Sequence, residues 1–173
     1  MNVDPKLVRD IMTTTLITVS PEDDLGEAMA RMADAGSHHL PVVRERTGRG
    51  EVEVVGMISD RDLRLASNSP YLWGTSAEIV DALRGLRVAD VMSGEVVSIF
   101  PSATVGEAAR LLLTRRIGAL PVIEQELGRP FLVGIVTQSD ILQHVVDVEP
   151  DTMDLALDPD EAASDGSMEP AGD

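Results

Sequence analysis

A short segment in the first half of the chain recurs in the second half. Residues 56–62 read Gly-Met-Ile-Ser-Asp-Arg-Asp, and residues 134–140 read Gly-Ile-Val-Thr-Gln-Ser-Asp. In both copies the apolar residues end on a hydroxyl side chain, and a carboxylate follows three positions later. A chain that repeats itself folds as repeated units, so this duplication restricts the possible folds more than any other feature of the sequence.

The repeat extends well beyond these two segments. A shift of 80 positions aligns Val8 with Val88, whereas Gly56 and Gly134 are 78 positions apart. The change in spacing falls in a polar segment, where a surface hairpin can change length at little cost. The sequence therefore predicts a first repeat at 1–66, a linker at 67–87, a second repeat at 88–147 and an acidic tail at 148–173.

Each copy predicts the same order of elements: a short strand, a helix, a hairpin and a second helix. Asp24 and Thr104 are each followed three positions later by Glu, which is typical of a helix N-terminus, and Gly36 is expected to end the first of these helices. The expected strands are 17–19, 40–43, 52–58, 97–99, 120–123 and 131–136, and the expected second helices are 60–66 and 138–146. Helices on one face of a small sheet leave an apolar surface uncovered, so we expect an α/β (α+β) fold in which two β-α-β-β-α repeats pack face to face.

The composition narrows the possible function classes. The chain has no Cys, which excludes disulfides and Cys-based zinc sites or nucleophiles. Residues 1–10 carry no apolar signal core, and no run approaches the roughly 18 apolar residues of a membrane span. We therefore expect a soluble cytoplasmic protein that does not contact a membrane.

The net charge of −16 is concentrated at the C-terminal end. Residues 149–173 hold nine acidic residues and no Lys or Arg, which leaves −7 for residues 1–148. Such a segment buries too little apolar surface to offset its ordering entropy, so we expect a disordered tail; the alternative is an acidic docking segment for a basic partner. An acidic chain with two Phe, one Tyr and one Trp lacks the basic surface and the stacking platforms of a nucleic-acid-binding protein.

The repeated hydroxyl-x-x-Asp motif allows two interpretations. At a strand-to-helix turn, Asp62 or Asp140 can accept hydrogen bonds from a polyol, and the free N–H groups of the helix favour a phosphate. The same spacing is that of a plain helix N-cap, in which Ser59 or Thr137 only closes the first turn. Spacing alone favours capping, whereas the duplication favours a ligand role at one copy or both.

The order of the motifs resembles that of the cystathionine-β-synthase (CBS) domain. The first copy has Val-x-Asp-Ile-Met-Thr from Val8, Gly-Glu-Ala from Gly26, Leu-Pro-Val-Val from Leu40 and Gly-Met-Ile-Ser-x-x-Asp-Leu from Gly56, and the second copy has equivalent motifs from Val88 onward. The resemblance covers residues 8 to about 146. It implies an intramolecular pseudo-dimer of two repeats, often called a Bateman module, and commonly a flat, disc-shaped homodimer of two such modules.

The resemblance also implies a ligand. Many CBS pairs bind adenine nucleotides or related adenosyl compounds in two clefts between the repeats. By this resemblance Asp62 and Asp140 would accept hydrogen bonds from ribose hydroxyls, the motif hydroxyls would contact phosphate or ribose, and the backbone near Thr18 and Ser98 would contact the base. The candidate ligand-binding residues are Thr18, His38, His39, Pro41, Ser59, Arg61, Asp62, Ser98, Ala119, Pro121, Thr137 and Asp140.

The two copies differ around the motif. His38 and His39 stand where nucleotide-binding relatives similar to the AMP-activated kinase regulatory subunit have a basic pair that contacts phosphate, and the equivalent Gly118 and Ala119 cannot do so, although two arginines one turn earlier can partly compensate. Arg61 also lies inside the first motif. We therefore expect unequal sites, with the more phosphate-friendly one near the first motif and a phosphate affinity that depends on pH. The alternative is that these are ordinary polar surface residues.

These features favour a stand-alone regulatory module that binds an adenine nucleotide and signals to a separate effector protein, because the flanking residues are too few for a further domain. The alternative is a structural dimerisation module with vestigial sites. An enzyme is disfavoured, because the sequence has no Gly-rich phosphate loop and no defensible catalytic triad, and we expect no catalytic cofactor. A metal site is not expected either, since adjacent residues such as His38 and His39 point apart on a strand.

Overall fold

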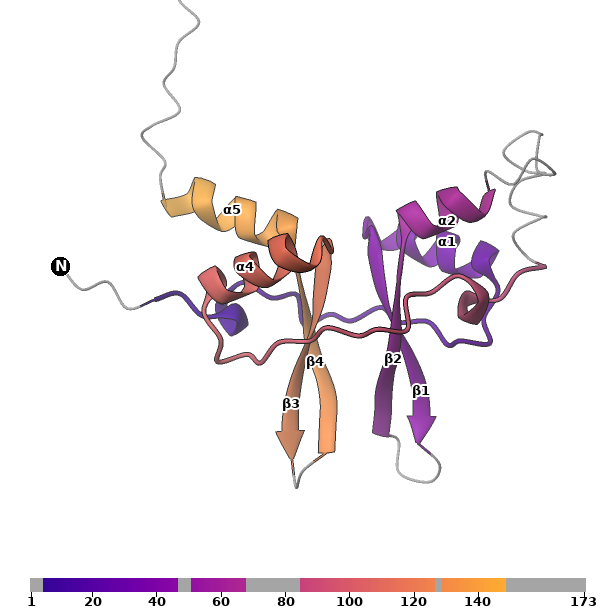
Figure 1. Cartoon of the computed structure of the whole chain (residues 1–173), viewed down its shortest axis with the longest axis horizontal. Helices are drawn as coiled ribbons and strands as arrows, with labels where there is room; N and C mark the ends of the chain where they lie inside the picture. The colour runs from indigo at the N-terminus through magenta and orange to yellow at the C-terminus, as the bar shows by residue number, and fades with distance from the viewer. Residues whose placement is uncertain (1–4, 47–50, 68–84, 127–128, 149–173) are drawn as a thin grey trace, which may run out of the picture.

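The computed structural model describes residues 5–46, 51–67, 85–126 and 129–148. They form two similar halves, each with a helix, an antiparallel hairpin and a second helix (Figure 1). The first half contains α1 (Leu25–Ala35), β1 (His39–Arg46), β2 (Glu51–Ser59) and α2 (Asp60–Ser67). The second half contains α4 (Val105–Arg115), β3 (Ala119–Glu126), β4 (Arg129–Thr137) and α5 (Gln138–Val148). The duplication and the fold class predicted from the sequence are confirmed. Most of the predicted linker lies outside the described residues, as does the predicted acidic tail apart from Val148, the last residue of α5.

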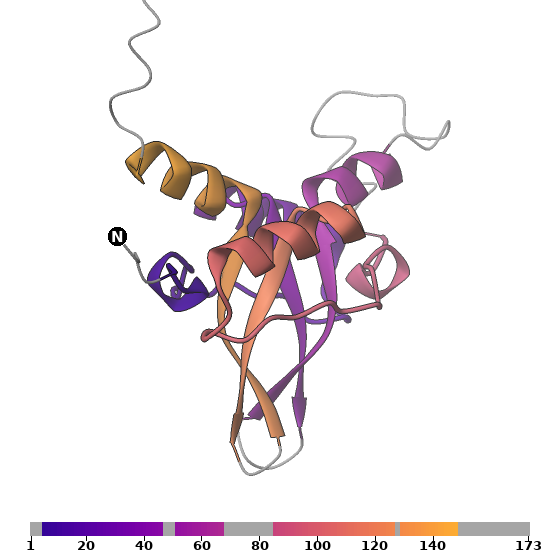
Figure 2. The same ribbon diagram turned by 60° about the vertical axis from the view of Figure 1, so that its left-hand side comes forward.

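The hairpins match each other in register. β1 pairs with β2 and β3 with β4, and each pairing is interrupted by a bulge at the same place, after Val42 and after Val122. The two hairpins project to one end of the molecule and the helices gather at the other, as Figure 2 shows. β2 and β4 lie next to each other, so the hairpins form the seam between the halves.

The strands predicted at 17–19 and 97–99 are reduced to single bridges. Val19 forms one parallel bridge with Val42, and Ile99 forms the equivalent bridge with Val122. A proline follows two positions after each bridge residue, and its missing N–H prevents further pairing. Each half therefore has a two-stranded sheet that this segment joins by a single bridge, where the sequence predicted a third strand.

Both predicted helix starts are present. The Asp24 carboxylate accepts a hydrogen bond of 2.8 Å from the backbone N–H three residues on, and Thr104 heads a complete capping box. The helix ends differ: Gly36 closes α1 in the left-handed conformation at φ 59°, whereas Arg116 closes α4 at φ 55°. A residue with a side chain is strained in this conformation, so the second half carries a local cost that the first half avoids.

The segment that begins each repeat packs against the opposite half. η1 (Val8–Asp10) places Val8 in the core of the second half, where its N–H donates to the carbonyl of Ala103 at 2.8 Å. η2 (Val88–Asp90) places Val88 in the core of the first half, where its N–H donates to the carbonyl of Asp23 at 2.9 Å. Each half is therefore completed by residues that precede the other in the sequence.

This exchange explains the glycine that opens each motif. Met12 crosses Gly134, and Met92 crosses Gly56, so closely that an added Cβ would lie 2.7 Å from the methionine sulfur in both cases. A neighbouring backbone carbonyl would also lie 3.0 or 3.2 Å from the added atom. Only glycine admits the exchanged segments at this distance, and the methionines complete the apolar packing on either side of the seam.

Candidate functional site

Each hydroxyl-x-x-Asp motif lies where a strand passes directly into a helix. The Ser59 hydroxyl donates a hydrogen bond of 2.6 Å to Oδ2 of Asp62, and the Ser59 N–H donates to the same oxygen at 2.8 Å. The hydroxyl and N–H of Thr137 donate to Oδ2 of Asp140 in the same way, both at 2.7 Å. Each Asp N–H in turn donates to the hydroxyl at 3.3 Å. The helix-cap interpretation is therefore realised in both halves.

Capping does not use the whole carboxylate. Every hydrogen bond that the described residues donate to Asp62 and Asp140 ends on Oδ2. The second oxygen, Oδ1, keeps its capacity to accept hydrogen bonds, and both side chains are half-buried in cavity walls. A carboxylate in this position can accept a hydrogen bond from an external diol. Capping and ligand binding are therefore compatible on one side chain.

The larger cavity, which we call the Asp62 cleft, has a volume of about 640 Å³ and is lined by both halves. The first half contributes its motif residues Ser59, Arg61 and Asp62. The residues that the second half contributes include Ser93, Glu95, Val97, Arg116, Gly118 and Ala119. A cavity of this size accommodates a nucleotide-sized molecule.

The second cavity, the Asp140 cleft, has a volume of about 330 Å³ and is built in the same way with the halves exchanged. The second half contributes its motif residues Thr137, Ser139 and Asp140. The residues that the first half contributes include Thr13, Thr15, Ile17, His38, His39 and Pro41. These positions are mostly the repeat equivalents of those in the Asp62 cleft, so the two clefts are related by the internal symmetry of the chain.

Each motif therefore faces the hairpin start of the opposite half. His38 lines the Asp140 cleft, and His39 lines both clefts. The structure therefore divides the His pair that the alignment placed near the first motif: His39 also lines the cleft of that motif, whereas His38 lines the cleft of the other motif. An alignment compares residues within one repeat, whereas each cleft combines the motif of one repeat with the wall of the other. Arg61 does line the Asp62 cleft, where Arg116 of the second half joins it.

Three candidate residues, Thr18, Ser98 and Pro121, are not among the residues that line the two clefts. Ile17 and Val97, one position earlier, do line them. The carbonyl of Thr18 already accepts a hydrogen bond of 2.7 Å from an α1 guanidinium, and Pro121 is buried. The apolar side chains before Thr18 and Ser98 therefore form the cleft walls at these two places.

Sequence reasoning missed a pair of hydroxyl residues. Thr13 lines the Asp140 cleft, and Ser93 lines the Asp62 cleft. Each also pairs with a strand of the opposite half, Thr13 with Ile135 and Ser93 with Met57. A signal was present, because a hydroxyl residue follows the methionine of the Val-x-Asp-x-Met motif in both copies. It was not recognised because the exchange of these segments between the halves was not predicted.

The clefts differ in the charged residues that line them. Arg61 and Arg116 line the Asp62 cleft together with the acidic residues Asp60, Asp62 and Glu95. Glu95 also forms a 3.8 Å ion pair with Arg115. Within the described residues, the His pair provides the basic side chains that line the Asp140 cleft, which no Lys or Arg lines. Burial lowers the pKa of His39, although nearby carboxylates oppose the shift, so this ring is mainly neutral at pH 7.

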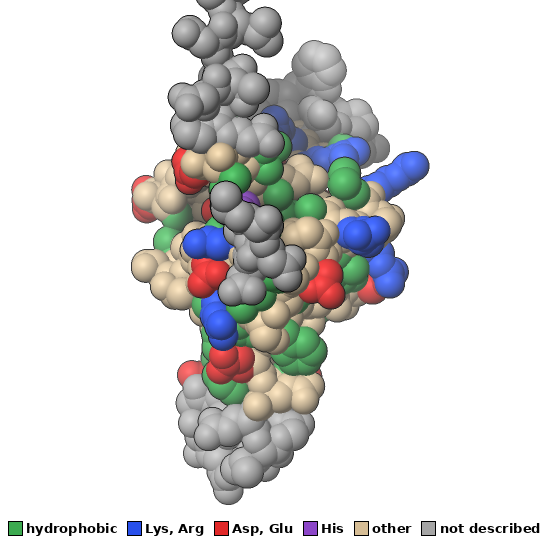
Figure 3. Space-filling model, turned by 90° about the vertical axis from the view of Figure 1, so that its left-hand side faces the viewer, with side chains coloured by type: hydrophobic (Ala, Val, Ile, Leu, Met, Phe, Trp, Pro, Cys, Tyr) green, Lys and Arg blue, Asp and Glu red, His purple; other side chains and the backbone are tan. Residues whose placement is uncertain are grey.

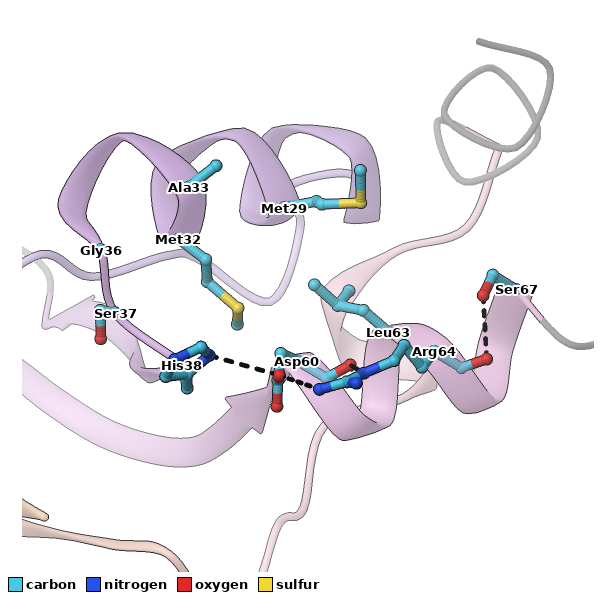
Figure 4. A pocket seen from close by; sticks show the side chains of 10 residues that line it. All are labelled: Met29, Met32, Ala33, Gly36, Ser37, His38, Asp60, Leu63, Arg64 and Ser67. Atoms are coloured by element: carbon cyan, nitrogen blue, oxygen red, sulfur yellow. Dashed lines mark hydrogen bonds and ion pairs between the residues drawn. The ribbon is translucent and has the colours of Figure 1, made fainter. Parts of the chain in front are cut away.

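A third cavity lies between α1 and α2 of the first half (Figure 4). Met29, Met32 and other apolar side chains form most of it, and His38 and Arg64 both reach the Asp60 carboxylate at one end. The His38 Nδ1 lies 3.3 Å from Oδ2 of Asp60. Burial alone would raise the pKa of Asp60, but Arg64 and His38 together hold this pKa below its ordinary value. His38 thus joins this groove to the Asp140 cleft.

The described residues contain no group of three or more His, Cys, Asp or Glu side chains arranged to hold a metal ion. In the same part of the chain, the helices are all too short or too polar to cross a membrane.

Comparison with known proteins identifies the repeat. The model of the CBS domain matches residues 8–69 and again residues 88–147. A CBS domain-containing protein of Dictyostelium discoideum is 34% identical over 142 residues, which cover 82% of this chain and 92% of that protein.

Solved structures give the same result. The CBS-pair protein CBSX2 of Arabidopsis thaliana has a TM-score of 0.65 and 27% identity, covering 85% of this chain and 99% of that one, and it has also been crystallised in complex with AMP. The CBS domain pair of protein MJ0100, in complex with 5′-methylthioadenosine and S-adenosyl-L-methionine, has a TM-score of 0.66 and 23% identity, covering 84% and 99%. The chain therefore belongs to the CBS domain family and carries two CBS domains in tandem.

Proposed function

We propose that this protein is a regulatory module that binds an adenosine nucleotide or a related adenosyl ligand in the two clefts and signals to a separate partner protein. The observation that carries the proposal is the construction of the clefts, each of which combines a carboxylate motif from one half with a wall from the other. A ligand that contacts both halves stabilises one arrangement of them over another, provided that it binds the two arrangements with different affinity. The adenosyl ligands of CBSX2 and MJ0100 support this ligand class.

In this proposal the cap and the ligand share the carboxylate. Oδ2 of Asp62 or Asp140 stays bonded to the motif hydroxyl, and Oδ1 accepts hydrogen bonds from the ribose hydroxyls. The base lies against the apolar wall, which is formed by Val97 in the Asp62 cleft and by Ile17 in the Asp140 cleft. The chain acts as a receptor in this account and catalyses no reaction, which agrees with its similarity to stand-alone CBS-pair proteins.

The two clefts are proposed to bind phosphate unequally. Arg61 and Arg116 can form charge-assisted hydrogen bonds to the phosphates of a ligand in the Asp62 cleft. The Asp140 cleft offers His38, which is exposed and already paired with Asp60, and the mainly neutral His39. The Asp62 cleft is therefore proposed as the more phosphate-friendly site, because of Arg61, which the sequence had indicated, and Arg116, which the second half adds.

Calorimetry with AMP, ADP and ATP tests this proposal. Asp62→Ala is expected to remove binding at one cleft and Asp140→Ala at the other, with the larger loss of ADP and ATP affinity in Asp62→Ala. Asp24→Ala is the matched control, because it removes a helix-capping carboxylate that lies in neither cleft. Equal losses in the two cleft variants would contradict the inequality, and unchanged binding in both would contradict the site.

The module is also proposed to form a homodimer through its helices. α4 and α5 expose apolar side chains, with Leu113 74% and Leu142 65% accessible and Val145 and Val146 about half accessible. Figure 3, which faces this side of the molecule, shows hydrophobic side chains between charged side chains of both signs. A second copy would cover this surface. Sedimentation of the protein and of Leu142→Glu is expected to give a dimer and a monomer respectively.

The capping hydrogen bonds favour a second candidate, a structural dimerisation module. In that account the carboxylates only cap α2 and α5, and the clefts bind nothing. Thermal denaturation separates the two candidates, because a ligand that binds only the folded state raises the melting temperature. A rise with AMP or another adenosyl compound supports the regulatory module, and no rise with any of them supports the structural one.

A further inference from the structure

His39 lies in the wall that the two clefts share. It lines both cavities, as do Gly118 and Gln138. The His39 ring rests directly on the backbone of Gly118, where an added Cβ would lie 2.4 Å from Nε2 and 2.7 Å from Cε1. The ring therefore crosses the seam and fills a space that exists because residue 118 has no side chain.

The internal symmetry does not provide a second ring. Ala119 is the repeat equivalent of His39, and its methyl group contributes to the Asp62 cleft alone. His38 is the equivalent of Gly118, and its side chain turns to Asp60. The two clefts thus share one imidazole, which the first half supplies to both.

A single imidazole cannot serve two ligands equally. A neutral ring has one N–H donor and one acceptor nitrogen, and its Nε2 edge already faces Gly118. A ligand in one cleft that draws the ring toward itself withdraws it from the other cleft, and moving the ring also changes the volume of both cavities.

We propose that His39 couples the two clefts negatively, so that a ligand bound in one cleft weakens binding in the other through the position of this ring. The inference rests on the proposed function, because it requires both clefts to accept a ligand. Coupling of this kind is reciprocal: each ligand reduces the affinity of the other by the same factor.

A double-mutant cycle with AMP as the probe tests the coupling. In the protein with His39 intact, Asp62→Ala empties the Asp62 cleft. AMP is then expected to bind the Asp140 cleft at least about 5-fold more tightly than it does in the second binding step of the unmodified chain. In the His39→Ala background, the same Asp62→Ala substitution is expected to leave the affinity of the Asp140 cleft unchanged. Calorimetry measures both affinities.

A second variant keeps the histidine but moves it. Gly118→Ala places a methyl group in the space of the ring and is expected to remove the coupling as His39→Ala does. Gly94→Ala is its matched control, because a Cβ at Gly94 meets nothing within 4 Å, and it should leave the coupling intact. Coupling as large as that of the unmodified chain in both His39→Ala and Gly118→Ala overturns this inference and leaves the proposed function standing. The absence of any AMP binding to the unmodified chain overturns both.

Discussion

The Asp62 and Asp140 clefts have the same motif and different surroundings. Both place a hydroxyl and a carboxylate at a strand-to-helix turn, with capping distances that agree within 0.1 Å. The walls differ, because Arg116 and Glu95 line one cleft where Gly36 and Thr15 line the other. The capping geometry, which the fold sets, is therefore alike in the two clefts, while the charged and polar residues of their walls differ.

The difference also shows how a duplicated chain can build two unlike clefts from one fold. Because the motif of each half faces the wall of the other, a substitution in one wall changes the opposite motif's cleft. His38 illustrates this, since it follows α1 of the first half and lines the cleft of the second motif. A change at one position can thus alter a single site and leave the other intact.

The largest expected effect tests whether the cores of the two halves contribute equally to the free energy of unfolding. Leu40 and Leu120 are repeat equivalents, 1% and 0% exposed. Replacing either with Ala is expected to lower the free energy of unfolding by about 2–5 kcal/mol. Because Val8 packs in the core of the second half and Val88 in the core of the first, we expect one cooperative urea transition for the whole molecule. Separate transitions for the two halves would contradict the exchange, and the exposed Glu124→Ala serves as a control with little effect.

The next effect concerns the charge of the walls. Arg116→Ala is expected to weaken ADP binding to the Asp62 cleft by about 10-fold or more, since a hydrogen bond to a charged group contributes about 1.5–3 kcal/mol. His38→Ala should weaken the Asp140 cleft less, because His38 is already paired with Asp60. Arg110→Ala is the control, because it removes an exposed charge that lies outside both clefts. A larger loss for His38→Ala, measured by calorimetry, would reverse the assignment of the phosphate-friendly cleft.

A smaller effect distinguishes the two helix ends. Gly36 and Arg116 share a left-handed backbone, which strains any residue with a side chain. Gly36→Ala is expected to destabilise the protein by about 1 kcal/mol, and Arg116→Gly to stabilise it by a similar amount. Thermal denaturation without ligand should therefore shift in opposite directions. Shifts of the same sign would show that contacts of the Arg116 side chain outweigh its backbone strain.

The smallest effect is the pH dependence of the seam. Burial lowers the pKa of His39 from its ordinary value of 6.5. The charges of Asp60 and Asp62 oppose this shift, and the nearby His38 adds to it. The unfolded chain therefore binds this proton more readily, so the contribution of His39 to stability should fall as the pH drops below about 6.5. His39→Gln is expected to flatten this part of the stability profile, as urea denaturation at several pH values would measure. An identical profile for both proteins would place the His39 ring in water.

The predictability of the fold follows from its local signals. The caps at Asp24 and Thr104, the hairpins and the second helices are encoded within a few residues, and the structure has each of them. The prediction of the short strands at 17–19 and 97–99 was wrong, because a proline limits each of these segments to a single bridge. The exchange of Val8 and Val88 could not be predicted, since it depends on which half each segment reaches in space.

The candidate site was predictable only in part, for the same reason. The motifs identified Asp62 and Asp140 because their spacing is local, and the structure brings both into clefts. The walls come from the opposite half, so the partner of each motif could not be read from an alignment of the repeats. His39 shows this most clearly: its type was noted in the sequence, but its position across the seam depends on the absence of a side chain at Gly118.

The most direct test is a crystal structure of the protein with AMP. The account predicts AMP in the seam, with ribose hydroxyls within hydrogen-bonding distance of Oδ1 of Asp62, of Asp140, or of both, and with the capping bonds to Oδ2 still present. AMP bound elsewhere on the molecule, or clefts that stay empty at saturating AMP, would contradict it.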